Sequence, residues 1–254
     1  MRWMVVLAIV TFVAGLASAQ DWDAVQSIPA FFDCRDGRDT HIIVTCHSQD
    51  VVRYGWTMYN AYGEIVQSWH GTAAPGSMKL WVPKRLLEED PAGFEQWDIA
   101  WGLFVIDVID DPSHKGSLSV TVAYYDSEGW GIGRQHIAQL PLAHESDDAA
   151  CRGAFYRATP TSHTVLTVVN VSSEDVEFTV SAFDLSGELI LEEDGYLLPF
   201  ESDYYVLREL VPQPPTNRYQ GVLKVAMDAE RSDSLLLVLS HWYEAELYRQ
   251  ELLP

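Results

Sequence analysis

The sequence is poor in cysteine and in basic residues. Three cysteines in 254 residues exclude a framework of several disulfides. One disulfide is possible, either Cys34–Cys46 or Cys34–Cys151, and the third thiol would then be unpaired. Lysine and arginine number 16 against 37 aspartates and glutamates, for a formal net charge of −21 at pH 7. Because the acids are spread over both halves of the chain, the surface repels phosphate backbones, and we exclude nucleic acid as a partner.

The motifs of common catalytic and cofactor sites are also missing. The sequence has no G-x-S-x-G nucleophile elbow, no H-E-x-x-H or C-x-x-C motif and no phosphate-binding loop. Residues 129–133 are glycine-rich, but a predicted strand follows them, so no helix N-terminus is there to hold phosphate. His41 and His47 would stand about 20 Å apart on one strand, too far to share a metal ion. We therefore expect no cofactor, no metal and no enzymatic activity.

Long hydrophobic runs are absent except at the N-terminus. Arg2 precedes an apolar stretch over residues 3–16, and Ala17-Ser18-Ala19 follows with the pattern of a cleavage site. The stretch is shorter than the roughly 20 residues that a membrane-spanning helix needs. We therefore predict a cleaved signal peptide over residues 1–19 and an exported protein, periplasmic or extracellular. No membrane span is expected in the mature chain.

The remainder of the chain contains an internal repeat. Residues 59–66 (YNAYGEIV) match residues 183–190 (FDLSGELI), and the offset of 124 continues to Pro75 and Pro199. Upstream, Thr40-His41 is aligned with Ser162-His163, which suggests a shared structural role for the two histidines. The repeat predicts a first domain over residues 20–145 and a second over residues 146–254.

Both copies have the pattern of short β-strands. In the second copy, Val176, Phe178, Val180 and Ala182 alternate with polar residues, which is the period of a half-buried strand. Turn residues recur every 8–12 positions, and long amphipathic helices are absent. We therefore predict an all-β protein of two tandem antiparallel β-sandwich domains, with a linker over residues 139–151.

One resemblance follows from these motifs. Each copy has an aromatic opening, a Thr/Ser-His strand, an F/Y-x-x-x-G-E hairpin and a late aromatic pair. In this pattern the chain resembles uncharacterised bacterial exported proteins with tandem immunoglobulin-like β-sandwich modules, over most of residues 29–253. The resemblance implies a fold and a compartment, and it implies no catalytic residues.

Acidic clusters are the only candidates for acid–base or cation chemistry. Glycoside hydrolysis needs two carboxylates across a sugar site, and three loop clusters could supply them. The segment 33–39 resembles a calcium loop only faintly, because it lacks the usual spacing, and a tight Asp-Gly turn explains it better. The clusters are Glu88-Glu89-Asp90, Asp107/Asp110/Asp111 and Glu192-Glu193-Asp194.

Tryptophan distinguishes the first copy from the second. Most tryptophans of the mature chain lie in the first copy, and some of them must belong to its core. Exposed tryptophan on a β-scaffold can stack on sugar rings or anchor a protein. The predicted ligand-binding residues are Trp97, Trp101 and Trp130.

The sequence favours a non-enzymatic exported protein that acts in binding, adhesion or cell-envelope structure. Its partner would be a glycan or a protein at the cell envelope. Two alternatives stay open: a secreted carbohydrate-active hydrolase that uses loop carboxylates, and a subunit of a surface assembly whose free strand edges pair with neighbours.

Overall fold

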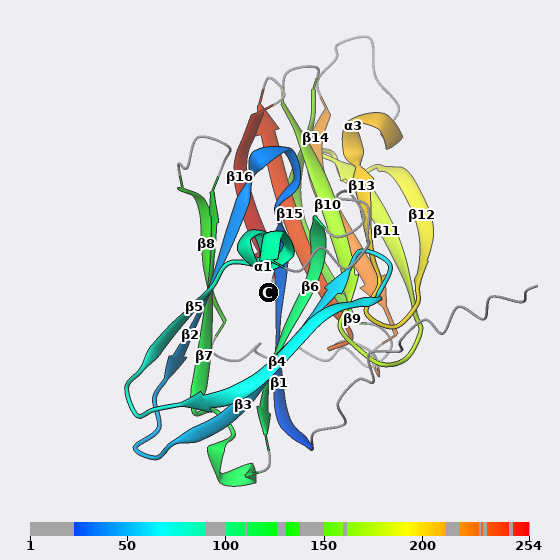
Figure 1. Ribbon diagram of the computed structural model, residues 1–254. Coiled ribbons are helices and arrows are strands. Elements are labelled where there is room, and N and C mark those ends of the chain that lie inside the picture. The colour runs from blue at the N-terminus through cyan, green and yellow to red at the C-terminus, as the bar shows by residue number, and fades with distance from the viewer. Residues whose placement is uncertain are drawn as a thin grey trace, which may run out of the picture.

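The computed structural model describes most of the chain as β-strands (Figure 1). The described residues are 23–89, 100–109, 111–125, 131–137, 150–159, 162–211, 219–228, 230, 233–243 and 246–253. Every pair of neighbouring strands is antiparallel. The predicted all-β class is therefore confirmed. The predicted signal peptide, residues 1–19, lies outside the described residues, as does the predicted domain boundary at residue 145.

Strands β1–β8, which we call the first half, form two four-stranded sheets with the orders β1-β6-β3-β4 and β5-β2-β7-β8. A short helix, α1 (Pro83–Glu89), follows β5, and single turns of 3-10 helix follow β1 (Arg35–Gly37) and β6 (Pro112–His114). The strands are β1 (Ala24–Asp33), β2 (Asp39–Cys46), β3 (Val52–Asn60), β4 (Ile65–Ala73), β5 (Met78–Trp81), β6 (Trp101–Ile109), β7 (Leu118–Tyr125) and β8 (Gly131–Ile137).

Strands β9–β16, the second half, belong to one eight-stranded sheet with the order β12-β11-β14-β9-β10-β15-β16, and β13 also pairs with β10. Strands β9 and β10 meet through one residue pair, His163 with Ala158. A helical turn, α3 (Leu207–Leu210), follows β13. The strands are β9 (Ala150–Ala158), β10 (Ser162–Asn170), β11 (Val176–Asp184), β12 (Leu189–Leu197), β13 (Ser202–Val206), β14 (Tyr219–Met227), β15 (Leu235–Tyr243) and β16 (Glu246–Leu253).

The order of pairing is the same in the two halves. Adding eight to each strand number converts β1-β6-β3-β4 into β9-β14-β11-β12, and β5-β2-β7-β8 into β13-β10-β15-β16. Two of these pairings also occur in the immunoglobulin sandwich: the second strand pairs with the fifth, and the third strand pairs with the sixth. The first strand, however, pairs with the sixth and the seventh pairs with the second, which is not the immunoglobulin order.

The hairpin between the third and fourth strands is repeated in the bonds that its backbone amides donate to one side chain. The side-chain oxygen of Asn60 accepts hydrogen bonds from the backbone amides of Tyr62 and Glu64. The carboxylate of Asp184 accepts the same bonds from Ser186 and Glu188. The glycines of the two turns, Gly63 and Gly187, have φ values of 78° and 86°, a conformation that favours glycine. The turn therefore has the same chemistry at an offset of 124.

The offset of 124 also applies to the strand that holds His41, and it contradicts the predicted alignment of His41 with His163. The hydroxyl of Thr40 accepts a hydrogen bond from the backbone amide of Asp33, and that of Thr164 accepts one from Arg157. Position 40 therefore corresponds to 164, so the alignment of His41 with His163 is wrong by two residues. His41 lies beside Tyr125, with ring centroids 4.5 Å apart. His163 is buried, and desolvation together with Arg208 lowers its pKa.

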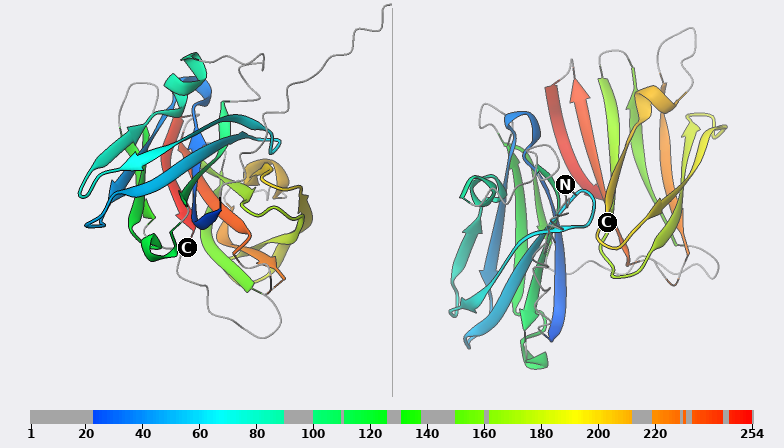
Figure 2. Two further views of the ribbon diagram at one scale, coloured as in Figure 1. Left: turned by 60° about the horizontal axis from the view of Figure 1, so that its bottom comes forward. Right: turned by 45° about the vertical axis from the view of Figure 1, so that its right-hand side comes forward.

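The two halves lie side by side and pack face to face (Figure 2). Strand β15 contributes to both cores, because consecutive residues of a strand point to opposite faces. Leu235, Leu237 and Leu239 belong to the core of the second half. Leu236 and Val238 belong to the core cluster of the first half. Strand β6 is likewise buried along its whole length. The apolar runs of these two strands therefore mark the seam between the halves.

Candidate ligand-binding face

Trp101, one of the three tryptophans predicted to bind a ligand, lies buried at the seam between the halves. Its side chain is 7 % exposed. The ring packs edge-on against Phe31 and Tyr204, with centroids 6.4 Å and 5.8 Å away. The guanidinium of Arg35 lies 4.4 Å from the ring centroid, at a cation–π distance. Protein groups thus already occupy the surface that a sugar ring would need.

Arg35 is itself held by charged neighbours. Its Nε and Nη2 donate hydrogen bonds of 3.0 and 2.9 Å to the two carboxylate oxygens of Asp33. Arg38 approaches the same carboxylate at 3.2 Å. The segment 33–39 therefore neutralises its buried aspartate with two arginines. This arrangement agrees with the predicted turn and leaves Asp33 without a role as a cation ligand.

The other two predicted tryptophans, Trp97 and Trp130, lie outside the described residues, so their part of the prediction stays a prediction. Three further tryptophans of the first half gather in and around its core. Trp69 and Trp81 have centroids 4.8 Å apart, and Trp81 and Trp56 5.2 Å apart. Trp56 stacks on Phe104 at 4.8 Å. The tryptophan excess of the first half is thus explained in part by packing.

Two aspartates of the acidic clusters that the sequence singled out form hydrogen bonds with serines. Asp107 accepts a hydrogen bond of 2.6 Å from Ser27. Asp111 accepts bonds from the amide and hydroxyl of Ser113, which lower its pKa. Asp90 and Asp110 lie outside the described residues. Among the residues that the structure does describe, no three His, Cys, Asp or Glu side chains stand close enough to hold a metal ion.

The three cysteine thiols are unpaired, so neither of the bridges left open by the sequence is formed. Cys46 is buried, Cys151 is exposed, and Cys34 is half-buried. Burial, together with the charges of Asp33 and Asp39, raises the pKa of Cys34 to about 12. A thiol with so little thiolate at neutral pH is a poor nucleophile. Cys34 is therefore not a catalytic candidate.

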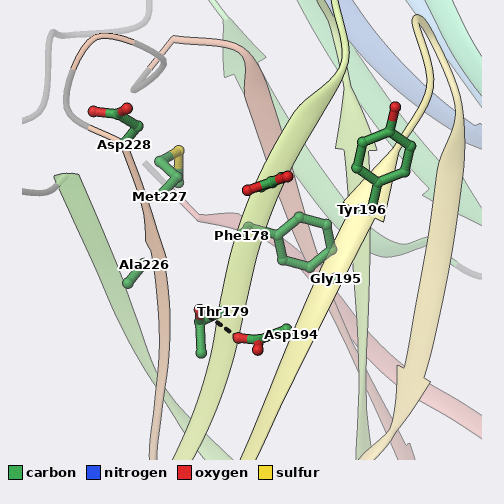
Figure 3. Close-up of a pocket in the computed structure, with 9 residues that line it drawn as sticks. Phe178, Thr179, Asp194, Gly195, Tyr196, Ala226, Met227 and Asp228 are labelled. Atoms are coloured by element: carbon green, nitrogen blue, oxygen red, sulfur yellow. Dashed lines mark hydrogen bonds between the residues drawn. The ribbon is translucent and has the colours of Figure 1, made fainter.

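A hollow of about 790 Å³ opens in the second half, where β11 begins and where β12 and β14 end (Figure 3). Its volume is within the range of small-molecule sites. Because neighbouring residues of a strand point to opposite faces, core and surface side chains both contribute to it. Its lining residues are Glu177, Phe178, Thr179, Asp194, Gly195, Tyr196, Ala226, Met227 and Asp228.

The apolar part of the hollow depends on a glycine. Phe178 pairs across the strands with Gly195. A Cβ at Gly195 would lie 2.2 Å from the ring of Phe178, so the ring occupies the place of a side chain there. The buried rings of Phe178 and Tyr205 meet edge-on at 6.1 Å. The apolar part of the hollow therefore lies on the inner side of β11 and β12, and Asp194 and Tyr196 lie on the outward side.

The polar part is acidic and aromatic. Glu177, Asp194 and Asp228 are exposed at its rim. The hydroxyl of Thr179 donates a hydrogen bond of 2.9 Å to Asp194, which holds that carboxylate in place. Tyr196 is 53 % exposed. Its hydroxyl donates to Asp175, and this bond raises its pKa, so the tyrosine stays protonated and its ring is oriented.

Sequence reasoning missed this site, although one signal was present. On β12, Glu192, Asp194 and Tyr196 point to the same outward side, because they alternate with residues that face the other way. An aromatic residue in a line of acids on an exposed strand face has no core to fill. The position of Tyr196 on the polar face could therefore have indicated a contact surface.

No protein-family model matches the chain, and the search of curated proteins also finds no match. Among solved structures, a protein described as secreted from Parabacteroides distasonis is 12 % identical, with 93 % of this chain and 83 % of that chain covered and a TM-score of 0.25. The PBSX exported protein XepA is 8 % identical, with 81 % and 82 % covered and a TM-score of 0.23.

A glycosyl hydrolase family 2 member from Bacteroides cellulosilyticus is 9 % identical, and the alignment covers 89 % of this chain and 27 % of that chain, with a TM-score of 0.16. Likenesses at this level carry no conclusion about fold or activity. Among the described residues, no helix is long and apolar enough to cross a membrane.

Proposed function

We propose that this chain is an exported, non-enzymatic binding protein of the cell envelope, and that the hollow at Tyr196 binds a saccharide. The chain would consist of a signal peptide over residues 1–19 and two β-sandwich modules over residues 20–145 and 146–254. The modules would be immunoglobulin-like in two of their strand pairings and would differ in the places of the first and seventh strands. The signal-like N-terminus supports export. The repeated order of strand pairing and the repeated hairpin support two related modules.

The chemistry of the hollow selects the class of ligand. Ionised carboxylates only accept hydrogen bonds, so Glu177, Asp194 and Asp228 require a ligand rich in donors. The exposed ring of Tyr196 requires a flat apolar surface to stack on. A sugar ring has hydroxyl donors at its edge and C–H groups on its faces. The combination of an exposed ring with three carboxylates around one hollow is the observation that carries the proposal.

The charge of the chain narrows the class further. A net charge of −21 and an acidic rim repel anions, so uronic acids and sulfated sugars are disfavoured. Neutral saccharides meet no such barrier, and amino sugars are attracted. We expect neutral or amino-bearing saccharides to bind, and acidic ones to bind more weakly or not at all.

The exposure of the carboxylates supports binding without turnover. A carboxyl group that acts as a general acid near neutral pH needs an environment that disfavours its charge. Glu177, Asp194 and Asp228 are all exposed to solvent at the rim of the hollow, and none of the three lies in a buried pocket. Hydrolysis of a bound saccharide would therefore contradict the non-enzymatic part of the proposal and favour the hydrolase alternative.

The test is a glycan array followed by calorimetric titration of the saccharides that bind. Tyr196→Ala should weaken binding by about tenfold or more, because stacking on one ring contributes about 1 kcal/mol beyond the buried area. Tyr196→Phe should keep most of the affinity. The matched control is Thr72→Ala, at the position of the first half that corresponds to Tyr196. Unchanged affinity in Tyr196→Ala would exclude this hollow as the site.

The sequence-based prediction that Trp97 and Trp130 bind the ligand remains a second candidate. Trp97→Ala and Trp130→Ala belong in the same titration. A loss of affinity in these variants with none in Tyr196→Ala would move the binding site to the first half, as the sequence predicted.

A further inference from the structure

In the contact between the halves, one sheet face of the first half packs on one sheet face of the second half. We call the outward side of β1, β6 and β3 the front face of the first half. Its central row is Phe31, Leu103 and Tyr59. The outward side of β13, β10 and β15 is the back face of the second half, with Val169, Leu236 and Val238. These residues share one buried core cluster, with Tyr59 at its margin.

The edges of this contact are also specific. Tyr59 stacks on Phe200 with ring centroids 4.5 Å apart. The backbone of Phe200 has a φ of 61°, which is unusual for an aromatic residue, whereas the corresponding residue of the first half is Gly76, with a φ of 67°. The amide of Ser202 donates a hydrogen bond of 2.8 Å to the carbonyl of Ala61.

The front face of the second half repeats the apolar row and leaves it uncovered. Phe155, Val222 and Phe183 pair across β9, β14 and β11 as Phe31, Leu103 and Tyr59 do across β1, β6 and β3. Phe155 is 46 % exposed and Val222 49 % exposed, whereas Phe31 and Leu103 are fully buried. The row that docks the second half onto the first is thus present again and has no partner within the described chain.

The back face of the first half exposes apolar side chains along its edge strand, β5. At its centre, Thr45, Ser119 and Thr121 hold the positions of Val169, Leu236 and Val238, so a contact there would be less apolar than the one between the halves. Met78 and Leu80 lie on β5 at the positions that Ser202 and Tyr204 hold on β13. They are 67 % and 55 % exposed. Tyr204 packs against Trp101 in the contact between the halves. Exposed apolar side chains therefore stand on the two faces that a continuation of this contact would bury.

We propose that copies of this chain associate head to tail, the front face of the second half of one copy docking on the back face of the first half of the next. The contact would continue the packing that already joins the two halves of one chain. Because front and back are different surfaces, the association does not close as a two-fold dimer and can extend to short linear oligomers. This inference goes beyond the proposed saccharide site and does not depend on it.

Two features set the strength of this contact and its dependence on salt. Gln220 takes the place of Trp101, and Thr159 that of Arg35, so the cation–π anchor of the internal contact is missing and association should be weaker. Like-charged chains repel, and this repulsion falls when the Debye length shrinks to about 3 Å near 1 M salt. The Tyr196 side of the hollow stays accessible, because Arg53, His70 and Thr72, the counterparts of Glu177, Asp194 and Tyr196, remain exposed in the contact between the halves. The counterparts of Ala226 and Asp228 are Asp107 and Ile109, which are buried, so association should cover the β14 side of the hollow.

The first experiment is analytical ultracentrifugation of the chain from Gln20 onward, over a range of concentrations at about 0.1 M and 1 M sodium chloride. We expect the weight-average mass to rise with concentration, and more so at high salt. A mass that stays that of one chain under all conditions would overturn the proposal.

The second experiment uses two complementary variants. Phe155→Glu with Val222→Glu blocks the front face, and Met78→Glu with Leu80→Glu blocks the back face. Each variant alone should be monomeric, and an equimolar mixture should form heterodimers and stop there, because each pair retains one intact front and one intact back. The control, Val51→Glu with Leu198→Glu, adds the same charge at exposed sites. Their counterparts in the other half, Asp175 and Ala74, stay exposed in the contact between the halves, so the control should associate like the unmodified chain.

The other outcomes of the mixing experiment count against the proposal. Dimers of the back-blocked variant alone would show a symmetric front-to-front contact instead. A mixture that stays monomeric, while circular dichroism shows both variants folded, would exclude the head-to-tail contact. Equal loss of association in the control would attribute the effect to charge and not to the two faces.

Discussion

The front faces of the two halves have the same row of apolar residues and different surroundings. In the first half, Phe31 and Leu103 are fully buried beneath the second half. In the second half, Phe155 and Val222 at the same positions are about half exposed. The difference shows that strand order and core packing leave the use of an outer face undetermined. A neighbour can cover the face, or the face can stay free for a partner.

The largest effect should come from truncating the matched phenylalanines. Phe31→Ala removes a fully buried ring and should cost about 3–5 kcal/mol of unfolding free energy. Phe155→Ala removes a half-exposed ring and should cost about 1 kcal/mol or less. Urea unfolding followed by tryptophan fluorescence measures both. Equal losses in the two variants would mean that Phe155 is also covered within one chain.

The second largest difference between the halves should be the reactivity of their cysteine thiols. A pKa of about 12 instead of 9 makes the thiolate fraction of Cys34 about a thousandfold smaller near pH 8, while Cys151 is exposed. Under reducing pretreatment, one of the three thiols should react rapidly with a disulfide reagent in the native chain and all three after unfolding. Rapid reaction of two thiols in the native chain would contradict the burial of Cys34 and Cys46.

The matched turn glycines should give a smaller difference. Gly63→Ala places a Cβ 2.4 Å from the backbone oxygen of Pro199 in the second half, whereas Gly187→Ala meets nothing within 4 Å. Both substitutions strain a positive φ, at about 1 kcal/mol each. Gly63→Ala should therefore lower the unfolding midpoint more. An equal shift would show that the turn at Gly63 does not touch the second half.

The smallest effect should be the pH dependence at His163. Desolvation and Arg208 hold its pKa below the usual 6.5, so the folded state binds fewer protons than the unfolded state. The stability that His163 contributes is then present above about pH 6.5 and is lost as the pH falls toward the lowered pKa. His163→Asn should flatten the stability profile between about pH 7 and pH 5. A steeper profile in the variant would reverse the sign of the pKa shift.

Much of the fold could be predicted from local patterns. The alternation from Val176 to Ala182 predicted a strand, and the structure has β11 there. The Ser186-Gly187 turn predicted the hairpin between β11 and β12, because glycine supplies the positive φ. The order of the strands in each sheet was not predictable from these patterns. The alternation in a strand indicates which side chains face the core, and it does not indicate which strand lies beside it.

The candidate site was harder to predict, for a physical reason. The sequence does not distinguish an exposed tryptophan from a buried one. The side chains that bury Trp101 are those of Phe31, Arg35 and Tyr204. Tyr204 is more than a hundred residues away in the sequence. Tyr196 was visible only as a departure from the polar face of its strand. Such a departure becomes informative once the outward side of the sheet is known.

The most direct test of the difference between the two front faces is hydroxyl-radical footprinting of the chain at low concentration and low salt, read out by mass spectrometry. Phe155 and Val222 should be modified readily, and Phe31 and Leu103 should be protected until the chain unfolds. Equal modification of Phe31 and Phe155 in the folded chain would contradict the arrangement in which one front face is covered and the other is free.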